Sequence, residues 1–595
     1  MKGVRSYLSL RLIAVMTLYT AVMLWVMPPS GDALLSDDWD YSISVFDWGQ
    51  DGRLTISDFP SMTLIGHLTW GKLFAILFGN HHVVLRISTM VMAWVGALSL
   101  YRIARIADAT PTIATGIATL YLLNPMILWC SYTFLTDIIG CSVMLLFLAT
   151  VVPRLPLLIR QDVEGVDLQS PRGGAVIGQL IAMGVFTAGC YLVRQTAVIP
   201  ALACLVLFVP LMLKGRLSWR RGSVVLFAFA VPVICFWIWI TQWHGVPLGF
   251  EKQMLGLGQL THPKIVLMKV IRIALTIAFY LSPLALAWWV GRVQRSEQAS
   301  WRACAPVLLS AVGLAAALLL LPPLATARLY WGISAVDELV GDFPQVMGLR
   351  QSLLPVTIDW GPLQSNLFDL VVIPLASLST ICLLNWALVS RDELRQPVSL
   401  CFSGGTPTIC AVGFVAAMGQ LLLLLLIWNL FGRYLAPLMS LCLVVLATQV
   451  AVRVTGANQH QWGIHVPTFA VGLLLMATYS LVTTHDTRAR FEAVWDVAQR
   501  LRGSGVDVSE IDIGMPFRGT YQYRPELASL LRKENKTLGQ LSIRQRRELL
   551  RGRSTGRYQL ALAGEQPSDA VVIETLTPAT WLPAEPWVLL RFAGQ

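Results

Sequence analysis

Three aspartates and two aromatic residues stand together near the start of the chain, in the stretch Asp37-Asp38-Trp39-Asp40-Tyr41. A carboxylate can accept the proton of a hydroxyl group, and a second carboxylate beside it raises its pKa through like-charge repulsion. Aspartates also occur where a helix begins and its end is hydrated. The stretch is therefore a candidate for acid–base chemistry, with helix capping as the alternative.

Three further polar residues stand at the ends of long apolar runs: Asp137, Arg194 and Arg433. A guanidinium group binds phosphate oxygens through paired hydrogen bonds and stays charged, so Arg194 and Arg433 are candidates for binding a phosphate. A single arginine at a membrane edge can instead extend its charge toward water. Asp137 stands in the first turn of a predicted helix, where it would either cap the helix or orient a substrate.

The composition indicates a membrane protein. Of the 595 residues, 55% are hydrophobic and 13% are charged, and the mean hydropathy is +0.63. These values are typical of a chain that crosses the membrane many times. The net charge of +11 does not indicate nucleic-acid binding, because the basic residues lie mostly in short loops and in the C-terminal segment. His81-His82 are adjacent and would need a third ligand to hold a metal, so we expect neither a metal nor a cofactor.

The apolar runs predict a mainly α protein with about thirteen membrane-spanning helices. The first run, Leu12–Met27, is followed by Pro28-Pro29 and no cleavage site, which favours an uncleaved anchor. The runs are 12–27, 83–104, 112–129, 136–152, 176–193, 197–213, 224–240, 267–290, 304–321, 367–388, 409–430, 435–452 and 466–481.

Basic residues predict the orientation of these spans. They gather in alternate loops, such as those holding Arg102 and Arg105 or Lys214 and Arg216, which the positive-inside rule assigns to the cytoplasm. The N-terminus is then cytoplasmic. The acidic stretch follows a single anchor and is therefore expected on the side opposite the cytoplasm. Because the predicted number of spans is odd, the C-terminus is expected on that same side.

Three loops on the predicted outer side are long: 28–82, 243–264 and 327–364. The first contains Met62–Phe78, whose mixture of apolar and polar residues predicts a helix lying on the membrane surface. Together these loops would cover a cavity. Aromatic residues in the other two loops, such as Trp243, Tyr330, Trp331 and Trp360, are also typical of an interfacial belt.

The polar segment 485–595, called the tail below, predicts a small α/β domain that follows a membrane domain of residues 1–484. Helical spacing occurs at 490–501, 526–533 and 543–551, and short strands are predicted at 506–513, 558–563, 570–574 and 588–592. The tail shows no nucleotide-binding loop and no metal motif. We expect it to cover or steady the outer face.

This layout resembles the GT-C superfamily of membrane glycosyltransferases, most of all its protein O-mannosyltransferase and lipid A aminoarabinose transferase branch. The similarity covers nearly the whole membrane portion and lies in the order and common membrane side of several short motifs. They are Asp37-Asp38 with Tyr41, Leu77-Phe78-Gly79, Arg86, Thr136-Asp137, Arg194, and Arg433-Tyr434-Leu435-Ala436-Pro437. Three departures are Asp38, where the family usually has Glu, Asp40, where the aminoarabinose branch tends to have a basic residue, and Ser57-Asp58-Phe59-Pro60, which lacks that branch's phosphate-contacting Lys.

The resemblance implies an inverting enzyme at the periplasmic face of a bacterial inner membrane. It would move a sugar from a polyprenyl-phosphate donor to a hydroxyl of a glycan, lipid or protein. Such a reaction needs a base for the hydroxyl and cations for the leaving phosphate. Asp37 is the candidate base, Asp137 or Asp38 would orient the acceptor or tune the base, and Tyr41 would support them. Arg194 and Arg433 would bind the donor phosphate.

Two other functions fit the composition. A transporter or flippase of lipid-linked sugars is the main alternative, and it would place ionisable residues in mid-span and carry internal repeats, which the sequence does not show. The other is an envelope scaffold whose tail binds a partner.

Overall fold

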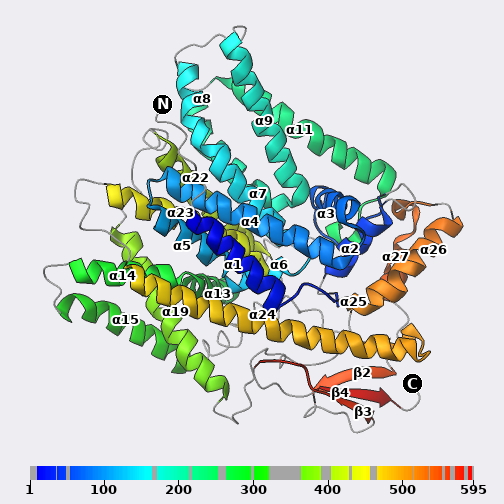
Figure 1. Cartoon of the computed structure of the whole chain (residues 1–595). Helices are drawn as coiled ribbons and strands as arrows, with labels where there is room; N and C mark the ends of the chain where they lie inside the picture. Colours follow the sequence, from blue (N-terminus) through cyan, green and yellow to red (C-terminus); the bar gives the residue numbers. More distant parts are fainter. Residues whose placement is uncertain are drawn as a thin grey trace.

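The computed structural model describes residues 10–31, 33–34, 37–48, 54–163, 171–213, 218–251, 263–295, 301–320, 364–389, 404–427, 432–455, 465–513, 515–534, 536–551, 557–562, 570–581 and 587–592. Within them the chain is mainly helical, as the sequence predicts, with a small sheet near the C-terminus (Figure 1). Most of the predicted outer loop 327–364, including Tyr330, Trp331 and Trp360, lies outside the described residues.

Every apolar run predicted to span the membrane contains helix. In the described part of the chain, seven helical stretches are long and apolar enough to cross a membrane, and two bent helix pairs bring the number to as many as nine. The predicted count of thirteen crossings is not confirmed. The seven are α4 (His82–Ile106), α7 (Thr136–Thr150) continued by η1 (Val152–Arg154) and the start of α8 (Leu155–Val163), α9 (Pro171–Val193), η2 (Gln195–Val198) with α10 (Ile199–Leu213), α11 (Trp219–Ile238) with η3 (Trp239–His244), α22 (Gly405–Leu426) and α24 (Val466–Gly503).

Two predicted spans are each divided into two helices. α5 (Pro111–Leu122) and α6 (Pro125–Ser131) meet at 62°, and the pair α13 (Pro263–Tyr280) and α14 (Ser282–Arg295) bends by 70°. At the first bend Pro125 has no N–H to continue α5, and the side chain of Asn124 accepts the N–H of Met126 at 3.1 Å and so starts α6.

Four further helices correspond to the remaining predicted spans: α1 (Leu10–Val26), α15 (Trp301–Leu320), α19 (Gln364–Val389) and α23 (Leu435–Thr455). The predicted surface helix is α3 (Ile65–Phe78), on which Ile76, Leu77 and Phe78 are exposed and suited to contact with lipid. α2 (Asp38–Asp47) is a helix that the sequence analysis does not predict.

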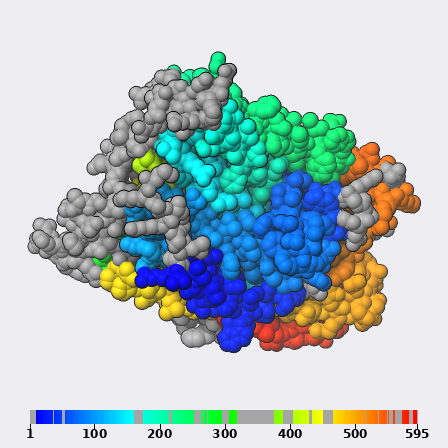
Figure 2. Space-filling view, turned by 45° about the horizontal axis from the view of Figure 1, so that its top comes forward, coloured from blue at the N-terminus to red at the C-terminus, as the bar shows by residue number. Residues whose placement is uncertain are grey.

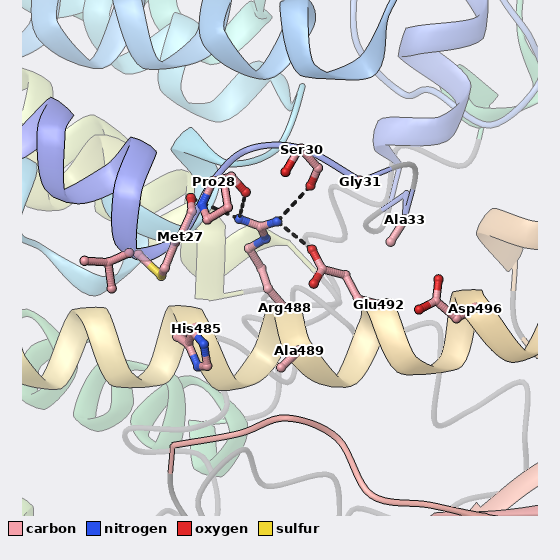
Figure 3. Close-up of a pocket in the computed structure, with 11 residues that line it drawn as sticks. Met27, Pro28, Ser30, Gly31, Ala33, His485, Arg488, Ala489, Glu492 and Asp496 are labelled. Carbon is pink, nitrogen blue, oxygen red and sulfur yellow. Dashed lines mark hydrogen bonds and ion pairs between the residues drawn. The ribbon is translucent and has the colours of Figure 1, made fainter.

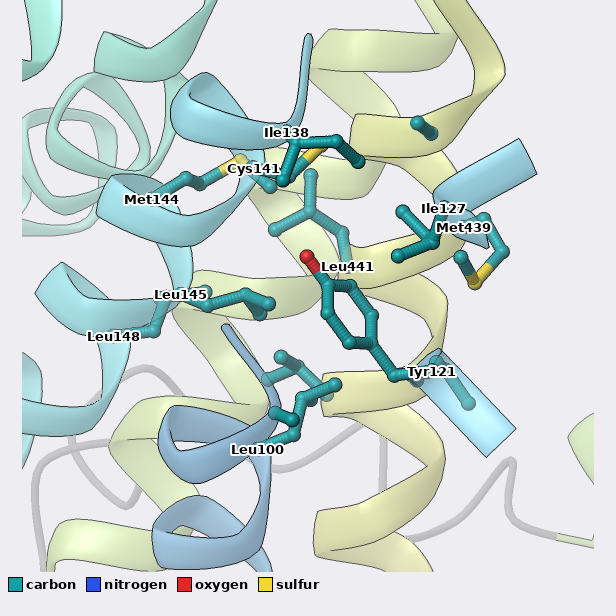
Figure 4. Packing of buried hydrophobic residues seen from close by; sticks show 14 of the residues in the cluster. Leu100, Tyr121, Ile127, Ile138, Cys141, Met144, Leu145, Leu148, Met439 and Leu441 are labelled. Atoms are coloured by element: carbon teal, nitrogen blue, oxygen red, sulfur yellow. The ribbon is translucent and has the colours of Figure 1, made fainter. Parts of the chain in front are cut away.

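Close packing joins the central helices into one frame. Figure 4 shows Tyr121 of α5 among Leu100 of α4, Leu145 of α7 and Leu441 of α23. A Cβ on Gly96 of α4 would lie 2.6 Å from the Tyr121 hydroxyl oxygen, so only glycine lets α4 and α5 approach this closely. The ends of these helices carry several of the predicted site residues.

α24 is 38 residues long and runs through the predicted boundary between residues 484 and 485 without a break. Its last turns help form a second hydrophobic cluster with the tail, separate from the core of the membrane part. Ala33, Leu34 and Trp39, from the region of the acidic stretch, also belong to this second cluster.

The tail forms the helices and the last three strands that its sequence predicts, with small differences at their ends. The predicted strand 506–513 is wrong for most of its length, because 508–510 is a 3-10 helix and only Ile511–Asp512 is a strand. Its helices are α25 (Met515–Arg518), the π-helix η8 (Gly519–Tyr523), α26 (Arg524–Glu534) and α27 (Ile543–Arg551), with 3-10 helices at 508–510 and 538–540. The strands β1 (Ile511–Asp512), β2 (Tyr558–Leu562), β3 (Ala570–Leu576) and β4 (Trp587–Phe592) form a sheet in the order β1-β2-β4-β3. β1 is parallel to β2, and the other pairs are antiparallel. Figure 2 shows these orange and red parts at one end of the body.

Candidate functional site

Asp37 immediately precedes α2 and faces Arg433, which lies on the 3-10 helix η6 (Gly432–Tyr434) just before α23. Nη2 of Arg433 donates to Oδ2 of Asp37 at 2.7 Å. The Asp37 carboxylate makes no capping hydrogen bond to α2, in contrast to the capping alternative. Its side chain is 30% exposed, whereas that of Arg433 is 7% exposed. A substrate hydroxyl can therefore reach the carboxylate, with a buried cation beside it.

Asp137 and Arg194 form a second pair of the same kind. Arg194 follows α9, and its Nη1 donates both to Oδ1 of Asp137 and to the hydroxyl of Thr136, the latter at 3.1 Å. The N-cap residue of α7 is Leu135, so Asp137 lies inside the first turn. Both side chains of this pair are nearly buried, 1% exposed for Asp137 and 7% for Arg194. Arg194 therefore lies within the protein and does not extend into water.

Tyr434 brings the two pairs together. The guanidinium carbon of Arg194 lies 5.3 Å from the centre of its ring, and that of Arg433 lies 5.7 Å from the same centre. The two guanidinium groups are thus no more than about 11 Å apart, on the same ring. Residues from the start of α2, from α7, from the end of α9 and from η6 meet here, although the partners of the two pairs are 57 and 396 residues apart in the chain.

Tyr41 and Asp38 have different partners around α2. Tyr41 is one helical turn after Asp37, and its buried ring packs edge-on against His67 at 5.6 Å between ring centres. Burial raises the pKa of Tyr41 well above its ordinary value, and the negative charge of Asp37 adds to this, so its hydroxyl stays protonated. Asp38 is buried; its Oδ1 accepts the hydroxyl of Ser42 at 2.9 Å, and its Oδ2 has no hydrogen-bond partner among the described residues.

Two arginines hold the backbone that leads into α2. Arg86 of α4 donates to the carbonyl oxygens of Pro29, Gly31 and Ala33. Figure 3 shows that Arg488 of α24 reaches the same segment and also Glu492. A cavity of about 320 Å³ lies beside this contact. Arg86, part of the family resemblance, therefore stabilises the segment before Asp37.

A neighbouring side of α2 faces the tail. Nε of Arg524 lies 3.5 Å from Oδ1 of Asp40, and its Nη2 donates to the Asp40 carbonyl oxygen at 3.3 Å and to the Ser44 hydroxyl. Burial raises the pKa of Asp40 to about 6, and the positive charge of Arg524 opposes that rise. Trp39 packs edge-on against Phe59 and Tyr523.

Asp58 joins three segments at a buried point. Nε of Arg546, on α27, donates to its two carboxylate oxygens at 3.0 and 2.9 Å, and the N–H of Leu248 donates to Oδ1 at 2.9 Å. Nη2 of Arg546 also donates to the carbonyl oxygen of Val246 at 2.7 Å. The side chains of Asp58 and Arg546 are 1% and 7% exposed. This pair connects the segment that follows α2, the segment after η3 and the tail.

The sequence analysis missed Tyr434, Arg524 and Arg546 as functional candidates. Tyr434 stood in a motif but carried no role. Arg524 and Arg546 give no local signal, because their partners lie more than 480 residues away in the chain. In the described residues, no group of three or more His, Cys, Asp or Glu side chains is arranged to hold a metal ion.

No model of a protein family matches the chain, and no curated protein matches it in sequence. Among solved structures, the chain is similar to ArnT from Cupriavidus metallidurans, in the apo state and bound to undecaprenyl phosphate. Each comparison has 14% identity and a TM-score of 0.36 and covers 97% of this chain, with 98% and 97% of ArnT covered respectively. ArnT is a lipid A aminoarabinose transferase, the branch that the sequence motifs resemble.

The chain is also similar to the archaeal oligosaccharyltransferase AglB from Archaeoglobus fulgidus, in complex with an inhibitory peptide and a dolichol-phosphate. This comparison has 14% identity and a TM-score of 0.38, and it covers 83% of this chain and 58% of AglB.

Proposed function

We propose that the chain is a membrane glycosyltransferase of the GT-C superfamily. It moves a sugar from a polyprenyl-phosphate donor to a hydroxyl of a glycan, lipid or protein, at the periplasmic face of a bacterial inner membrane. One observation carries the proposal: the Asp37–Arg433 and Asp137–Arg194 pairs meet around the ring of Tyr434. A carboxylate open to solvent beside buried cations is what a hydroxyl acceptor and a phosphate leaving group require.

The positions of these groups support a reaction in one step. The acceptor hydroxyl donates its hydrogen bond to Asp37, which takes the proton as the oxygen attacks the sugar's anomeric carbon. The bond from that carbon to the phosphate oxygen breaks, and polyprenyl phosphate leaves with the electron pair. Arg433 and Arg194 would balance the charge that develops on the phosphate. A single displacement of this kind inverts the anomeric centre.

In this proposal each arginine gains the phosphate as a further partner during the reaction. Arg433 is bonded to Asp37 at 2.7 Å, and Arg194 is bonded to Asp137. A phosphate would share these guanidinium groups, each of which carries five N–H donors. Asp137 would keep Arg194 in orientation, and the hydroxyl of Tyr41 would donate to the acceptor or to Asp37. Asp38 is buried and would support the start of α2.

The test is turnover by the purified chain in lipid vesicles. Labelled polyprenyl-phosphate sugars are supplied with candidate hydroxyl acceptors, and the released polyprenyl phosphate is measured. We expect release that requires an acceptor and is lost in Asp37→Asn. A folded protein that moves lipid-linked sugars across the bilayer without releasing polyprenyl phosphate would instead favour a transporter.

The sidedness is tested separately. Ser504 is exposed just after α24. We expect Ser504→Cys to react with a membrane-impermeant thiol reagent from the periplasmic side. Reaction only from the cytoplasmic side would overturn the proposed orientation of the tail and of Asp37.

A further inference from the structure

Two parts of the chain hold neighbouring sides of α2. Asp37 and Tyr41, one turn apart, face Arg433 and His67 of the membrane part. Asp40 and Ser44, also one turn apart, face Arg524 of the tail. Because three residues advance a helix by nearly one turn, a rotation of α2 that moves Asp40 away from Arg524 also moves Asp37 away from Arg433.

α2 cannot fix its own position. It has 10 residues, and helices of this length are marginal in water without packing partners. Its placement therefore depends on the side-chain contacts on each side.

The contact with the tail is a buried ion pair. Arg524 is 5% exposed and Asp40 is 1% exposed. A charge that is buried without its partner destabilises a protein strongly, so each member of the pair requires the other to stay in place. Ser44 accepts a further hydrogen bond from the same guanidinium group, which fixes the helix over one full turn.

Two further contacts dock the tail against the segment that follows α2 and against the segment after η3. One is the buried Asp58–Arg546 pair. The other is the approach of Gly245 and Gly539, where a Cβ on Gly245 would lie 2.1 Å from the backbone nitrogen of Gly539. Gly245 also has a φ of +98°, which favours glycine. Arg524 is thus held by a docked tail and does not depend on α2 alone for its position.

We propose that Arg524 is a positioning residue for the reaction. Through Asp40 and Ser44, the tail sets the orientation of α2 and keeps the carboxylate of Asp37 at Arg433. The proposal rests on the proposed function, in which Asp37 is the base. The tail is then part of the catalytic framework, beyond covering the outer face.

The full-length chain in lipid vesicles provides the test. Arg524→Gln should lower turnover by about tenfold to a hundredfold, because a small displacement of the base is costly. The Kd of labelled undecaprenyl phosphate should stay within twofold, because Arg194 and Arg433 remain. The double variant Asp40→Asn with Arg524→Gln should turn over at least fivefold faster than Arg524→Gln alone. It leaves no unpaired buried charge, and the two amide side chains can contact each other.

The matched control is Arg500→Gln. Arg500 pairs with Glu574 at 2.7 Å in the same tail, but the two side chains are 58% and 44% exposed. This variant should keep normal turnover. A double variant no more active than Arg524→Gln, or an equal loss of turnover in Arg500→Gln, would overturn the positioning role.

A second readout does not depend on activity. The Asp37→Cys variant carries a thiol at the position of the proposed base, and its rate of reaction with a water-soluble thiol reagent is measured. We expect the added substitution Arg524→Gln to change this rate at least tenfold. The wild-type chain gives the background reaction of the other cysteines. If the wild-type enzyme turns over no donor but this rate changes, the glycosyltransferase proposal fails and the positioning role stands. A rate within twofold of that with Arg524 present overturns the positioning role.

Discussion

Asp37 and Asp40 are three residues apart and each faces an arginine, yet their surroundings differ sharply. Asp37 is 30% exposed and accepts a hydrogen bond at 2.7 Å, whereas Asp40 is 1% exposed and lies 3.5 Å from its partner. A base must be reachable by its substrate, and a buried ion pair must not be disturbed. One acidic stretch therefore provides a group suited to chemistry and a group suited to holding that chemistry in place.

The largest expected effect tests the exposed member. Asp37→Asn keeps the shape and hydrogen bonding of the side chain but cannot accept the proton, so turnover should fall by about 10²–10⁴-fold with donor binding unchanged. The matched control is Asp496→Asn, which removes an exposed carboxylate on α24 and should leave turnover unchanged. Near-normal turnover in Asp37→Asn would remove it as the base and leave Asp38 or Asp137.

The second prediction concerns the buried pairs. Arg546→Gln leaves Asp58 buried without its guanidinium partner and should weaken the docking of the tail by about 3–5 kcal/mol. Arg500→Gln breaks an exposed pair and should cost no more than about 1 kcal/mol. Limited proteolysis of the tail in intact vesicles measures the difference. Equal cleavage rates in the two variants would contradict it.

The third prediction is a pH dependence that Asp40 contributes. Burial raises its pKa to about 6 in the folded chain, so the folded state binds this proton more tightly than the unfolded state does. The proton on Asp40 therefore adds up to about 3 kcal/mol to the free energy of unfolding. This contribution is complete below about pH 4 and is lost as the pH rises through about 6. Thermal unfolding at several pH values should show this slope in the wild type and a smaller one in Asp40→Asn. Identical slopes would exclude Asp40 as its source.

The smallest effect concerns the donor phosphate. Arg433→Lys keeps the positive charge but loses the planar, paired donors, so the affinity for undecaprenyl phosphate should fall about tenfold. Equilibrium binding of the labelled lipid measures it, with Arg500→Gln as a control. Unchanged affinity in both Arg433→Lys and Arg194→Lys would place the phosphate elsewhere.

The sequence predicts most helices and three of the four strands of the tail, because apolar runs and alternating residues depend only on nearby positions. It does not predict α2. Without this helix, nothing in the sequence distinguishes the different surroundings of Asp37, Asp38 and Asp40. Nor does it predict the bend at Asn124-Pro125, although an Asn-Pro pair within a predicted span is a recognisable local signal.

The candidate site is predicted in its residues more than in its contacts. Asp37, Asp137, Arg194 and Arg433 were each suggested by position at a span end, and the structure brings all four together. The pairing of each aspartate with its arginine depends on packing between distant segments. Asp37 and Arg433, for example, are 396 residues apart in the chain. The partners of Asp40 and Asp58 lie in the tail, and no local pattern marks them.

The length of α24 has a consequence for the surrounding membrane. At 1.5 Å per residue its 38 residues extend about 57 Å, nearly twice the thickness of the bilayer's hydrocarbon layer. A helix adapts to a thinner or thicker bilayer by tilting. Because the far end of α24 packs with the tail, such a tilt would be transmitted to the contacts around α2. The lipid composition of the membrane would then affect how closely Asp37 and Arg433 stay aligned.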